Sequence, residues 1–270
     1  MRPGIDFEIR AESWGHLNEV MFDEPMHSGI GRYRSNFAYR GVSDVDYDLK
    51  TSLIRMGGDY KSLEQHIIRG FQKYAHLEMR EESSIWNWLS LAQHHGLPTR
   101  LLDWTYSPYV ALHFVTDHID KYDKDGAIWC VNFVETNKSL SPALQDKLDH
   151  AGARVFTTNM LNEAVQSLTS FDRQAIDPLV VFLEPPSLDS RIVNQSGLFS
   201  LITDAQTSLD EWLPERQGVY RKIVIPKELK WEIRDKLDQS NMNERVLFPG
   251  LDGLCQYLKR YYSPKQTPGA

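Results

Sequence analysis

The sequence predicts one α+β domain built on a mixed, mostly antiparallel sheet with flanking helices. Its composition is that of an ordinary globular protein, with 41% hydrophobic and 25% charged residues among 270. Short apolar runs typical of buried strands are interspersed with segments whose apolar residues recur at helical spacing. Because the two kinds of element do not alternate regularly, a doubly wound parallel sheet is not expected.

The expected elements of the N-terminal half begin with a strand and a short helix in residues 5–24. The run Phe37-Ala-Tyr-Arg-Gly41 predicts a strand that stops at the glycine. Apolar residues at helical spacing predict a helix over residues 62–80. Another helix is predicted over residues 84–95, because Gly96 follows it and ends it.

The C-terminal half begins with the clearest helix start in the chain. Ser107 suits the N-cap, and Pro108 suits the first helical turn, where its missing N–H leaves no hydrogen bond unmade. Four apolar runs then predict strands, and two amphipathic segments predict helices. The strands are expected at residues 126–134, 179–183, 197–203 and 220–225, and the helices at 227–237 and 251–261.

These elements are expected to form a single domain over residues 1–262. Its core is expected at about residues 25–205, followed by a strand-helix extension over residues 206–262. Residues 263–270 contain two prolines and nothing apolar to bury, so a disordered tail is predicted there.

Charge and cysteine content narrow the function classes. Lys and Arg number 30 against 37 Asp and Glu, a formal net charge of -7, so bulk electrostatic capture of nucleic acid is not expected. Cys130 and Cys255 lie in apolar runs and are predicted to be buried, reduced thiols, which suits the cytoplasm. The N-terminus lacks an apolar signal segment and no apolar run approaches a membrane span, so no membrane partner is expected.

The first candidate functional residue is Arg40, at the end of an apolar strand. A charge in that position must be paired or must face a cleft. Its guanidinium could hold a phosphate or carboxylate through two parallel hydrogen bonds, or it could form a structural salt bridge. Gly41, which follows, allows a sharp turn and a close approach to the backbone.

The second candidate is the polar segment between two core helices, residues 93–105. A loop rich in hydrogen-bonding groups on a rigid frame is typical of binding sites, and Arg100 and Asp103 could pair with each other. Adjacent histidines point apart and no CxxC motif is present, so no metal site is expected. The candidate ligand-binding residues here are Gln93, His94, His95, Thr99, Arg100, Asp103 and Trp104.

The third candidate is the stretch that holds Glu184, Arg191 and Gln195, just before the apolar strand at 197–203. Its polar residues could serve a site or form a solvated loop. The chain has no GxxxxGK[ST], GxGxxG or GxSxG motif, which removes the main support for phosphate-loop, Rossmann and nucleophile-elbow functions.

Together, these segments resemble the FRG domain, which is named for an aromatic-Arg-Gly motif. Tyr39-Arg40-Gly41 is similar to its opening, although Tyr39 stands where Phe is the namesake residue. The block from Ala92 to Thr105 (AQHHGLPTRLLDWT) resembles its most distinctive part nearly residue by residue. Arg191-Ile with Gln195-Ser-Gly-Leu-Phe199, and Leu247-Phe-Pro-Gly-Leu-Asp-Gly253, resemble later segments. The resemblance covers about residues 5–262.

A weaker similarity links the chain to ADP-ribosyltransferases of the Arg-Ser-Glu type. Tyr39-Arg40-Gly41 resembles their first strand motif, and Leu102-Asp-Trp-Thr105 with the helix after it resembles the second. This resemblance implies an ADP-ribosyltransferase-like fold, NAD as the substrate and no metal. It also implies a toxin or phage-defence effector whose acceptor is a protein, a nucleic acid or water.

The same resemblance implies a role for each site residue. Arg40 would hold the pyrophosphate, and Tyr39, Gly41 and Arg191 would line the ligand. Thr105 would hold the ribose or carboxamide, and His94 or His95 would contact the sugar. The catalytic group that supports charge at the anomeric carbon would be Gln195 or Glu184.

Two other functions remain open on the sequence. The same cleft could belong to a non-catalytic module that binds a nucleotide, an RNA end or a modified ligand. Alternatively, the two histidines and Asp103 could act as acid and base in a hydrolase or nuclease.

Overall fold

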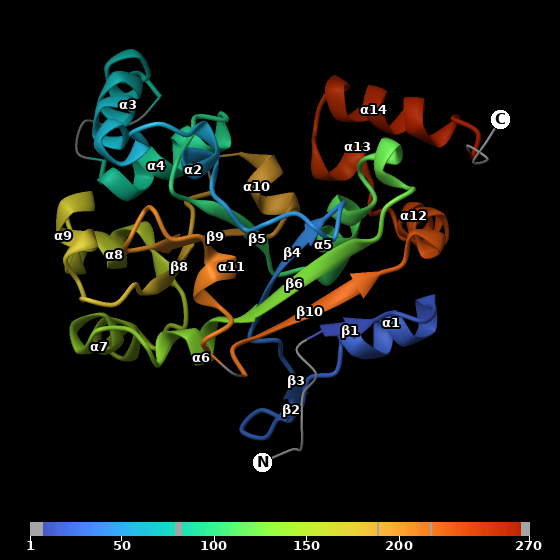
Figure 1. Cartoon of the computed structure of the whole chain (residues 1–270), viewed down its shortest axis with the longest axis horizontal. Coiled ribbons are helices and arrows are strands. Elements are labelled where there is room, and N and C mark those ends of the chain that lie inside the picture. Colours follow the sequence, from blue (N-terminus) through green and yellow to red (C-terminus); the bar gives the residue numbers. More distant parts are fainter. Residues whose placement is uncertain (1–7, 79–82, 188, 217, 266–270) are drawn as a thin grey trace.

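The computed structural model describes residues 8–78, 83–187, 189–216 and 218–265. An eight-stranded sheet runs through the middle of the molecule, in the order β1-β10-β6-β4-β5-β9-β8-β7 (Figure 1). The pairs β1–β10 and β7–β8 are parallel and the others are antiparallel, so the predicted α+β class with a mixed, mostly antiparallel sheet is confirmed. Its strands are β1 (Glu8–Arg10), β4 (Phe37–Val42), β5 (Leu102–Thr105), β6 (Gly126–Asn132), β7 (Phe156–Thr157), β8 (Val180–Glu184), β9 (Gly197–Ile202) and β10 (Tyr220–Ile225).

Helices surround the sheet, and a separate two-stranded hairpin, β2 (Met26–His27) with β3 (Arg32–Tyr33), projects from it. The α-helices are α1 (Trp14–Met21), α2 (Ser52–Met56), α3 (Tyr60–Tyr74), α4 (Ile85–His94), α5 (Pro108–Val115), α6 (Phe133–Asn137), α7 (Pro142–Ala151), α8 (Thr158–Ala164), α9 (Leu168–Asp172), α10 (Ser190–Asn194), α11 (Leu209–Trp212), α12 (Lys230–Gln239), α13 (Glu244–Leu247) and α14 (Leu251–Tyr261). Short 3-10 helices cover Ile119–Lys121 and Lys227–Leu229.

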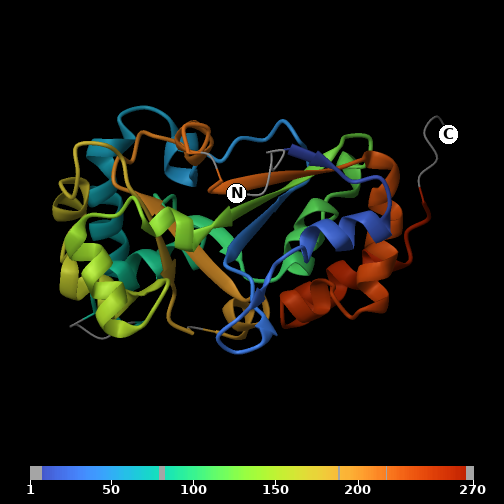
Figure 2. The same ribbon diagram turned by 90° about the horizontal axis from the view of Figure 1, so that it is seen from below.

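One face of the sheet carries two separate groups of helices. Helices α3, α4, α7, α8 and α9 cover the β8–β9 half, with Trp86 and Phe171 in their core. Helices α1, α5 and α12 cover the β4–β6–β10 half and pack on Tyr39. Tyr39 pairs with Thr105, and Asp103, two residues before Thr105, pairs with Phe199. Because residues two apart on a strand point to the same side, Tyr39 and Phe199 lie on one face of the sheet, and so do the two helix groups that pack on them. Figure 2 shows the two helix groups at opposite ends of the molecule.

The opposite face is covered by α6 and α11, which bury a third apolar cluster. Trp104 of β5 packs edge-on to Phe182 of β8, with ring centroids 5.9 Å apart. The Trp104 indole N–H donates to the Ser200 hydroxyl at 2.8 Å, so the polar atom of this buried ring is satisfied.

The sheet opens between β4 and β5. Strand β4 pairs with β6 along all six of its residues, but it pairs with β5 only where Tyr39 faces Thr105. Beyond that point the ladder stops, and the two strands are joined by a side chain instead. Arg40 Nη1 donates to the backbone oxygen of Asp103 at 2.7 Å. This opening lies between the two helix groups and is the natural place for a cavity.

Gly41 explains how α5 reaches the sheet at this opening. A Cβ atom built on Gly41 would lie 1.8 Å from the backbone oxygen of Ala111 in α5. Only a glycine lets the two backbones approach so closely. The helix itself starts as predicted, because the Ser107 hydroxyl accepts from the backbone N–H of Val110 and Pro108 occupies the first turn.

Several boundaries differ from the prediction. The helix predicted over 62–80 covers Tyr60–Tyr74, and residues 79 and 80 of that prediction lie outside the described residues. The strand predicted to end at 134 ends at Asn132, because that side chain accepts from two backbone N–H groups and caps α6.

Two predictions about the C-terminal part have different outcomes. Cys130 is buried as expected, but the prediction for Cys255 is wrong, because its place on α14 leaves the thiol exposed. Of the predicted tail, residues 266–270 lie outside the described residues. No described helix is both long and apolar enough to cross a bilayer.

The substitution Gly41→Ala is expected to lower the free energy of unfolding by about 1–3 kcal/mol, the usual effect of forcing an extra methyl group into a packed site. Urea denaturation followed by circular dichroism measures it. The matched control is Gly70→Ala in α3, where a Cβ meets nothing within 4 Å. That change is expected to raise stability by about 0.5–1 kcal/mol. A Gly41→Ala protein as stable as the wild type would contradict the close approach.

Candidate functional site

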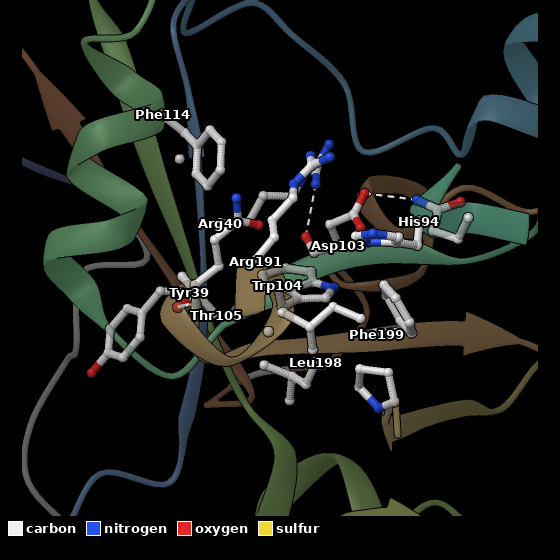
Figure 3. Close-up of a pocket in the computed structure, with 16 residues that line it drawn as sticks. Tyr39, Arg40, His94, Asp103, Trp104, Thr105, Phe114, Arg191, Leu198 and Phe199 are labelled. Carbon is white, nitrogen blue, oxygen red and sulfur yellow. Dashed lines mark hydrogen bonds between the residues drawn. The ribbon is translucent and has the colours of Figure 1, made fainter. Parts of the chain in front are cut away.

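A cavity of about 300 Å³ lies at the opening between β4 and β5 (Figure 3), and we call it the Arg40 pocket. It draws residues from β4, α4, β5, α5, α10 and β9, so segments far apart in the chain converge there. The predicted site residues that line it are Tyr39, Arg40, Gly41, Gln93, His94, Asp103, Trp104, Thr105, Arg191 and Gln195.

Arg40 is the electrostatic centre of the pocket. One guanidinium nitrogen donates to the Asp103 backbone oxygen, and the buried Nε has no hydrogen-bond partner. Within the described residues, no carboxylate oxygen comes within 4.0 Å of this guanidinium. Burial lowers the pKa of Arg40, and the Asp103 carboxylate only partly opposes that effect. A guanidinium so poorly compensated favours an anionic ligand.

Arg191 adds a second cation from the opposite wall. It lies at the start of α10 and lines the same pocket, and its side chain extends toward the same region as Arg40 in Figure 3. Its guanidinium lies over the Phe248 ring, 5.0 Å from the centroid. No ion pair involves Arg191 in the parts of the chain described. Two arginines without carboxylate partners therefore share one cavity.

Asp103 places a carboxylate in the pocket and is held by a short chain of hydrogen bonds. Gln93 Nε2 donates to Asp103 Oδ2 at 2.7 Å, and Thr99 Oγ1 donates to Gln93 Oε1 at 2.5 Å. Thr99 is itself fixed, because its hydroxyl accepts from the backbone N–H of Leu101. The other carboxylate oxygen of Asp103 makes no hydrogen bond within the described residues and is available to a ligand. Thr99 thus holds the Gln93 side chain in place and does not itself line the pocket.

Thr105 and Tyr39 serve mainly to build the floor. The buried Thr105 hydroxyl donates to the Gln195 backbone oxygen at 2.7 Å and accepts from the Ser107 N–H at 3.0 Å. The Tyr39 hydroxyl is bonded to Ser35 at 2.9 Å, and burial raises the pKa of Tyr39 to about 12. Figure 3 shows the Tyr39 ring pointing away from the two arginines.

Gln195 joins the pocket wall to the C-terminal helices. Its Nε2 donates to the backbone oxygen of Leu247 at 3.1 Å, which fixes the amide plane. Its backbone oxygen accepts from Thr105, so the residue is tied to the floor as well. Gln195 is therefore an ordered, uncharged side chain at the edge of the pocket.

The two histidines have different surroundings. His94 lines the pocket, and its Nε2 lies 2.6 Å from Asp189 Oδ2. Backbone N–H groups of α10 and His94 hold the pKa of Asp189 below its usual value, against the opposing effect of burial. His95 is exposed and does not line the cavity. The structure therefore does not bring His95 and Asp103 together as an acid–base pair.

Arg100 is placed differently from the prediction. Its guanidinium pairs with both carboxylate oxygens of Glu64 and with Asp172, and it is only 2% exposed. Burial alone would lower the pKa of Arg100, but these two carboxylates raise it above its usual value. The expected pairing of Arg100 with Asp103 is wrong, because Glu64 and Asp172 already use its donors.

Glu184 also lies away from the pocket. It is exposed at the end of β8 and accepts from the Tyr106 hydroxyl at 2.7 Å. It lines a different cavity beside the β2–β3 hairpin, with Tyr106 and Arg154. Among the described residues that line the Arg40 pocket, Asp103 supplies the carboxylate.

Apolar residues that the sequence did not single out for the site complete the lining. They are Phe114, Pro185, Ile192, Gly197, Leu198 and Phe199. Phe114 comes from the helix that follows the distinctive block, and the others come from the third candidate segment or its edge. The described residues contain no group of three or more His, Cys, Asp or Glu that could hold a metal ion.

The comparison with protein families agrees with the motifs that form the floor of the Arg40 pocket. The family model of the FRG domain matches residues 35–124, which include β4, β5 and α5. No curated protein and no solved structure matched the chain. The matched segment holds Arg40 and the whole of residues 93–105, whereas Arg191 and Gln195 lie beyond it. Residues 35–124 therefore match the FRG domain, and the rest of the chain lies outside that match.

Proposed function

We propose that the Arg40 pocket binds a diphosphate nucleotide of the NAD class and that the protein acts on it as an ADP-ribosyltransferase-type enzyme. One observation carries the proposal. Arg40 is a half-buried guanidinium whose buried Nε has no hydrogen-bond partner; it has no carboxylate partner among the described residues, and it faces a cavity. A partly desolvated charge without a counter-charge gains from pairing with an anion, so an anion in this cavity binds favourably.

The presence of a second arginine favours a diphosphate over a single carboxylate. Guanidinium groups bind phosphate oxygens through parallel hydrogen bonds, and Arg40 and Arg191 offer two such groups in one cavity. At about 300 Å³ the pocket is at the small end of ligand cavities. We place the diphosphate and the nicotinamide riboside inside, with the adenosine at the open mouth.

The reaction proposed is cleavage of the bond between the anomeric carbon and the nicotinamide nitrogen. The bonding electron pair moves to the nicotinamide ring and neutralises it, and positive charge develops on the ribose. The Asp103 carboxylate, held by Gln93, stabilises that charge, and Gln195 orients the ribose hydroxyls. An acceptor oxygen or nitrogen then bonds to the anomeric carbon and releases its proton.

The second candidate is a non-catalytic binding module that uses the same two arginines. The position of Glu184 favours it, because the expected strand-borne carboxylate lies outside the Arg40 pocket and Gln195 is uncharged. This module would be the right description if the protein binds NAD and ADP-ribose with similar affinity and releases no nicotinamide. A role as toxin or phage-defence effector belongs to the enzymatic proposal.

The substitution Arg40→Ala is expected to weaken ADP-ribose binding by about 1.5–3 kcal/mol, the usual contribution of a hydrogen bond to a charged group. This corresponds to roughly 10- to 150-fold in the dissociation constant, measured by isothermal titration calorimetry. The matched control is Arg154→Ala, which removes an exposed arginine that lines the other cavity. Equal affinity of the Arg40→Ala and wild-type proteins would refute the assignment of Arg40.

The substitution Asp103→Asn is expected to lower the rate of nicotinamide release from NAD by about 10²–10³-fold, as loss of a charge-stabilising group does. Ligand affinity should change little, because asparagine still accepts from Gln93. The assay follows free nicotinamide by chromatography, with water or a cell extract as the acceptor. Glu184→Gln is the matched control and should retain the wild-type rate. A wild-type protein that binds NAD without releasing nicotinamide would favour the binding module.

A further inference from the structure

Residues 246–248, at the end of α13 and just after it, contact α10 and its C-cap residue at three points. The Arg191 guanidinium lies over the Phe248 ring. Gln195 donates to the Leu247 backbone oxygen, and Asn194 Nδ2 donates to the Val246 backbone oxygen at 2.7 Å. All three contacts come from α10 or the residue that ends it, so α10 is held from this side.

The Phe248 ring also contacts the other pocket wall. It is perpendicular to the ring of Phe114, a pocket residue of α5, with centroids 6.4 Å apart. Its ring is 6.1 Å from that of His113. Phe248 therefore lies between α5 and α10, behind the two walls that face Arg40.

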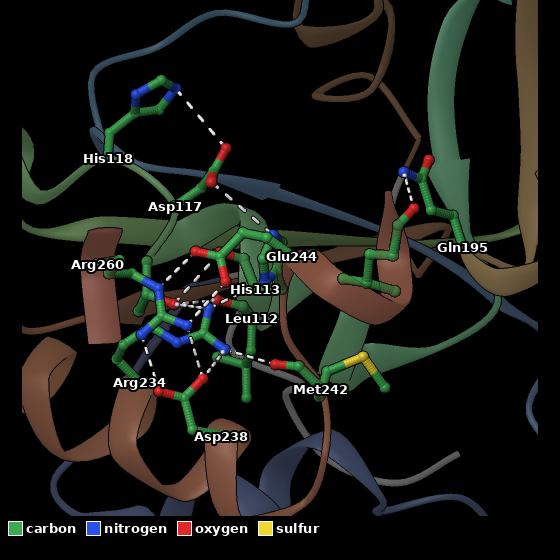
Figure 4. A network of polar contacts seen from close by, with 12 residues as sticks. Leu112, His113, Asp117, His118, Gln195, Arg234, Asp238, Met242, Glu244 and Arg260 are labelled. Carbon is green, nitrogen blue, oxygen red and sulfur yellow. Dashed lines mark hydrogen bonds and ion pairs between the residues drawn. The ribbon is translucent and has the colours of Figure 1, made fainter. Parts of the chain in front are cut away.

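A buried network of charges joins the helices next to Phe248 (Figure 4). Arg260 of α14 pairs with Glu244 of α13 and with both Asp238 oxygens, at 2.7 and 2.8 Å. Arg234 of α12 donates to His113 Nδ1 at 2.9 Å and to the Met242 backbone oxygen. Burial lowers the pKa of His113 to about 3, so its neutral ring can accept that bond. These contacts tie α12, α13 and α14 to α5.

A tight backbone contact between α14 and the end of α13 also holds the backbone of Phe248 in place. A Cβ atom on Gly253 of α14 would lie 1.9 Å from the Phe248 backbone oxygen and 2.7 Å from that of Glu244. Because glycine alone permits this approach, α14 presses directly on the end of α13. The ring of Phe248 thus projects from a backbone that has little freedom to move.

We infer that Phe248 is a positioning residue of the ligand site, and that the C-terminal helices hold Arg191 and Gln195 in place for an anionic ligand. The stacking of a guanidinium on an aromatic face limits the orientations of its N–H groups. Pre-arranged donors bind an anion more tightly than donors that must be ordered on binding. The inference rests on the proposed function in one respect, the binding of a diphosphate.

The test uses the full chain and inorganic pyrophosphate as the probe. Phe248→Leu is expected to weaken pyrophosphate binding about fivefold, in line with the modest strength of a partly exposed cation–π contact. Phe248→Trp, which keeps an aromatic face, should restore most of the affinity. Phe248→Leu should have no further effect in an Arg191→Ala protein, because the partner of the ring is already absent.

The matched control is Tyr257→Leu, another aromatic residue in this unit, whose ring faces Arg245 and Arg260 and not the pocket. It should lower the melting temperature about as much as Phe248→Leu while leaving pyrophosphate affinity unchanged. Equal loss of affinity in both variants, or independent effects of Phe248→Leu and Arg191→Ala, would overturn the inference.

A second measurement separates this inference from the proposed function. Modification of Arg191 by phenylglyoxal, followed by peptide mass spectrometry, should be several-fold faster in Phe248→Leu than in the wild type. If pyrophosphate does not bind the wild type but this difference is seen, the proposed ligand is wrong and the positioning role is supported. If the Arg191 rates are equal, the positioning role is wrong whatever binds.

Discussion

The site depends on the interruption of the sheet between β4 and β5. The two strands share one residue pair, Tyr39 with Thr105, and the ladder ends there. Beyond that pair, the carbonyl of Asp103 accepts a hydrogen bond from the Arg40 side chain instead of from a neighbouring strand. Arg40 therefore substitutes for a missing strand contact with one of its five N–H donors and offers others to the cavity. The nearby contact of Gly41 with α5 keeps that helix close enough to form a wall of the opening.

The contrast between two arginines of the matched segment shows why Arg40 is the one suited to a ligand. Arg100 is buried with two carboxylates, which raise its pKa, and it joins α3, the start of β5 and α9. Arg40 is half-buried beside a backbone carbonyl, and its pKa is lowered. Removing a charge partner from Arg100 would leave a buried cation unpaired, whereas an anion bound at Arg40 would give that guanidinium a counter-charge. The same type of side chain thus serves stability at Arg100, and under the proposed function it would serve recognition at Arg40.

The sequence predicted the local features of this site but not the contacts between segments that lie far apart in the chain. Ser107 and Pro108 start α5 by local chemistry. A charge at the end of an apolar strand left a structural salt bridge and a cleft open for Arg40, and Arg40 lines a cavity. The partner of Arg100 was not predictable, because Glu64 lies 36 residues away and its helix shows no sign of the contact. Glu184 was an alternative to Gln195 for the catalytic group, as the nearest carboxylate upstream, but it lies in the other cavity at the end of β8.

The pocket has a floor from one part of the chain and a wall from another. The floor, with Arg40 and Asp103, lies inside residues 35–124, the segment that matches the FRG family model. The wall, with Arg191 and Gln195, depends on contacts from α13 and α14 that lie well beyond that match. The floor supplies a carboxylate and a guanidinium, and the guanidinium suits many anionic ligands. The wall sets the size of the cavity and the place of the second cation. Under the proposed function, selectivity among such ligands would therefore arise in the wall, where a change at the C-terminal helices would alter recognition without touching the family motif.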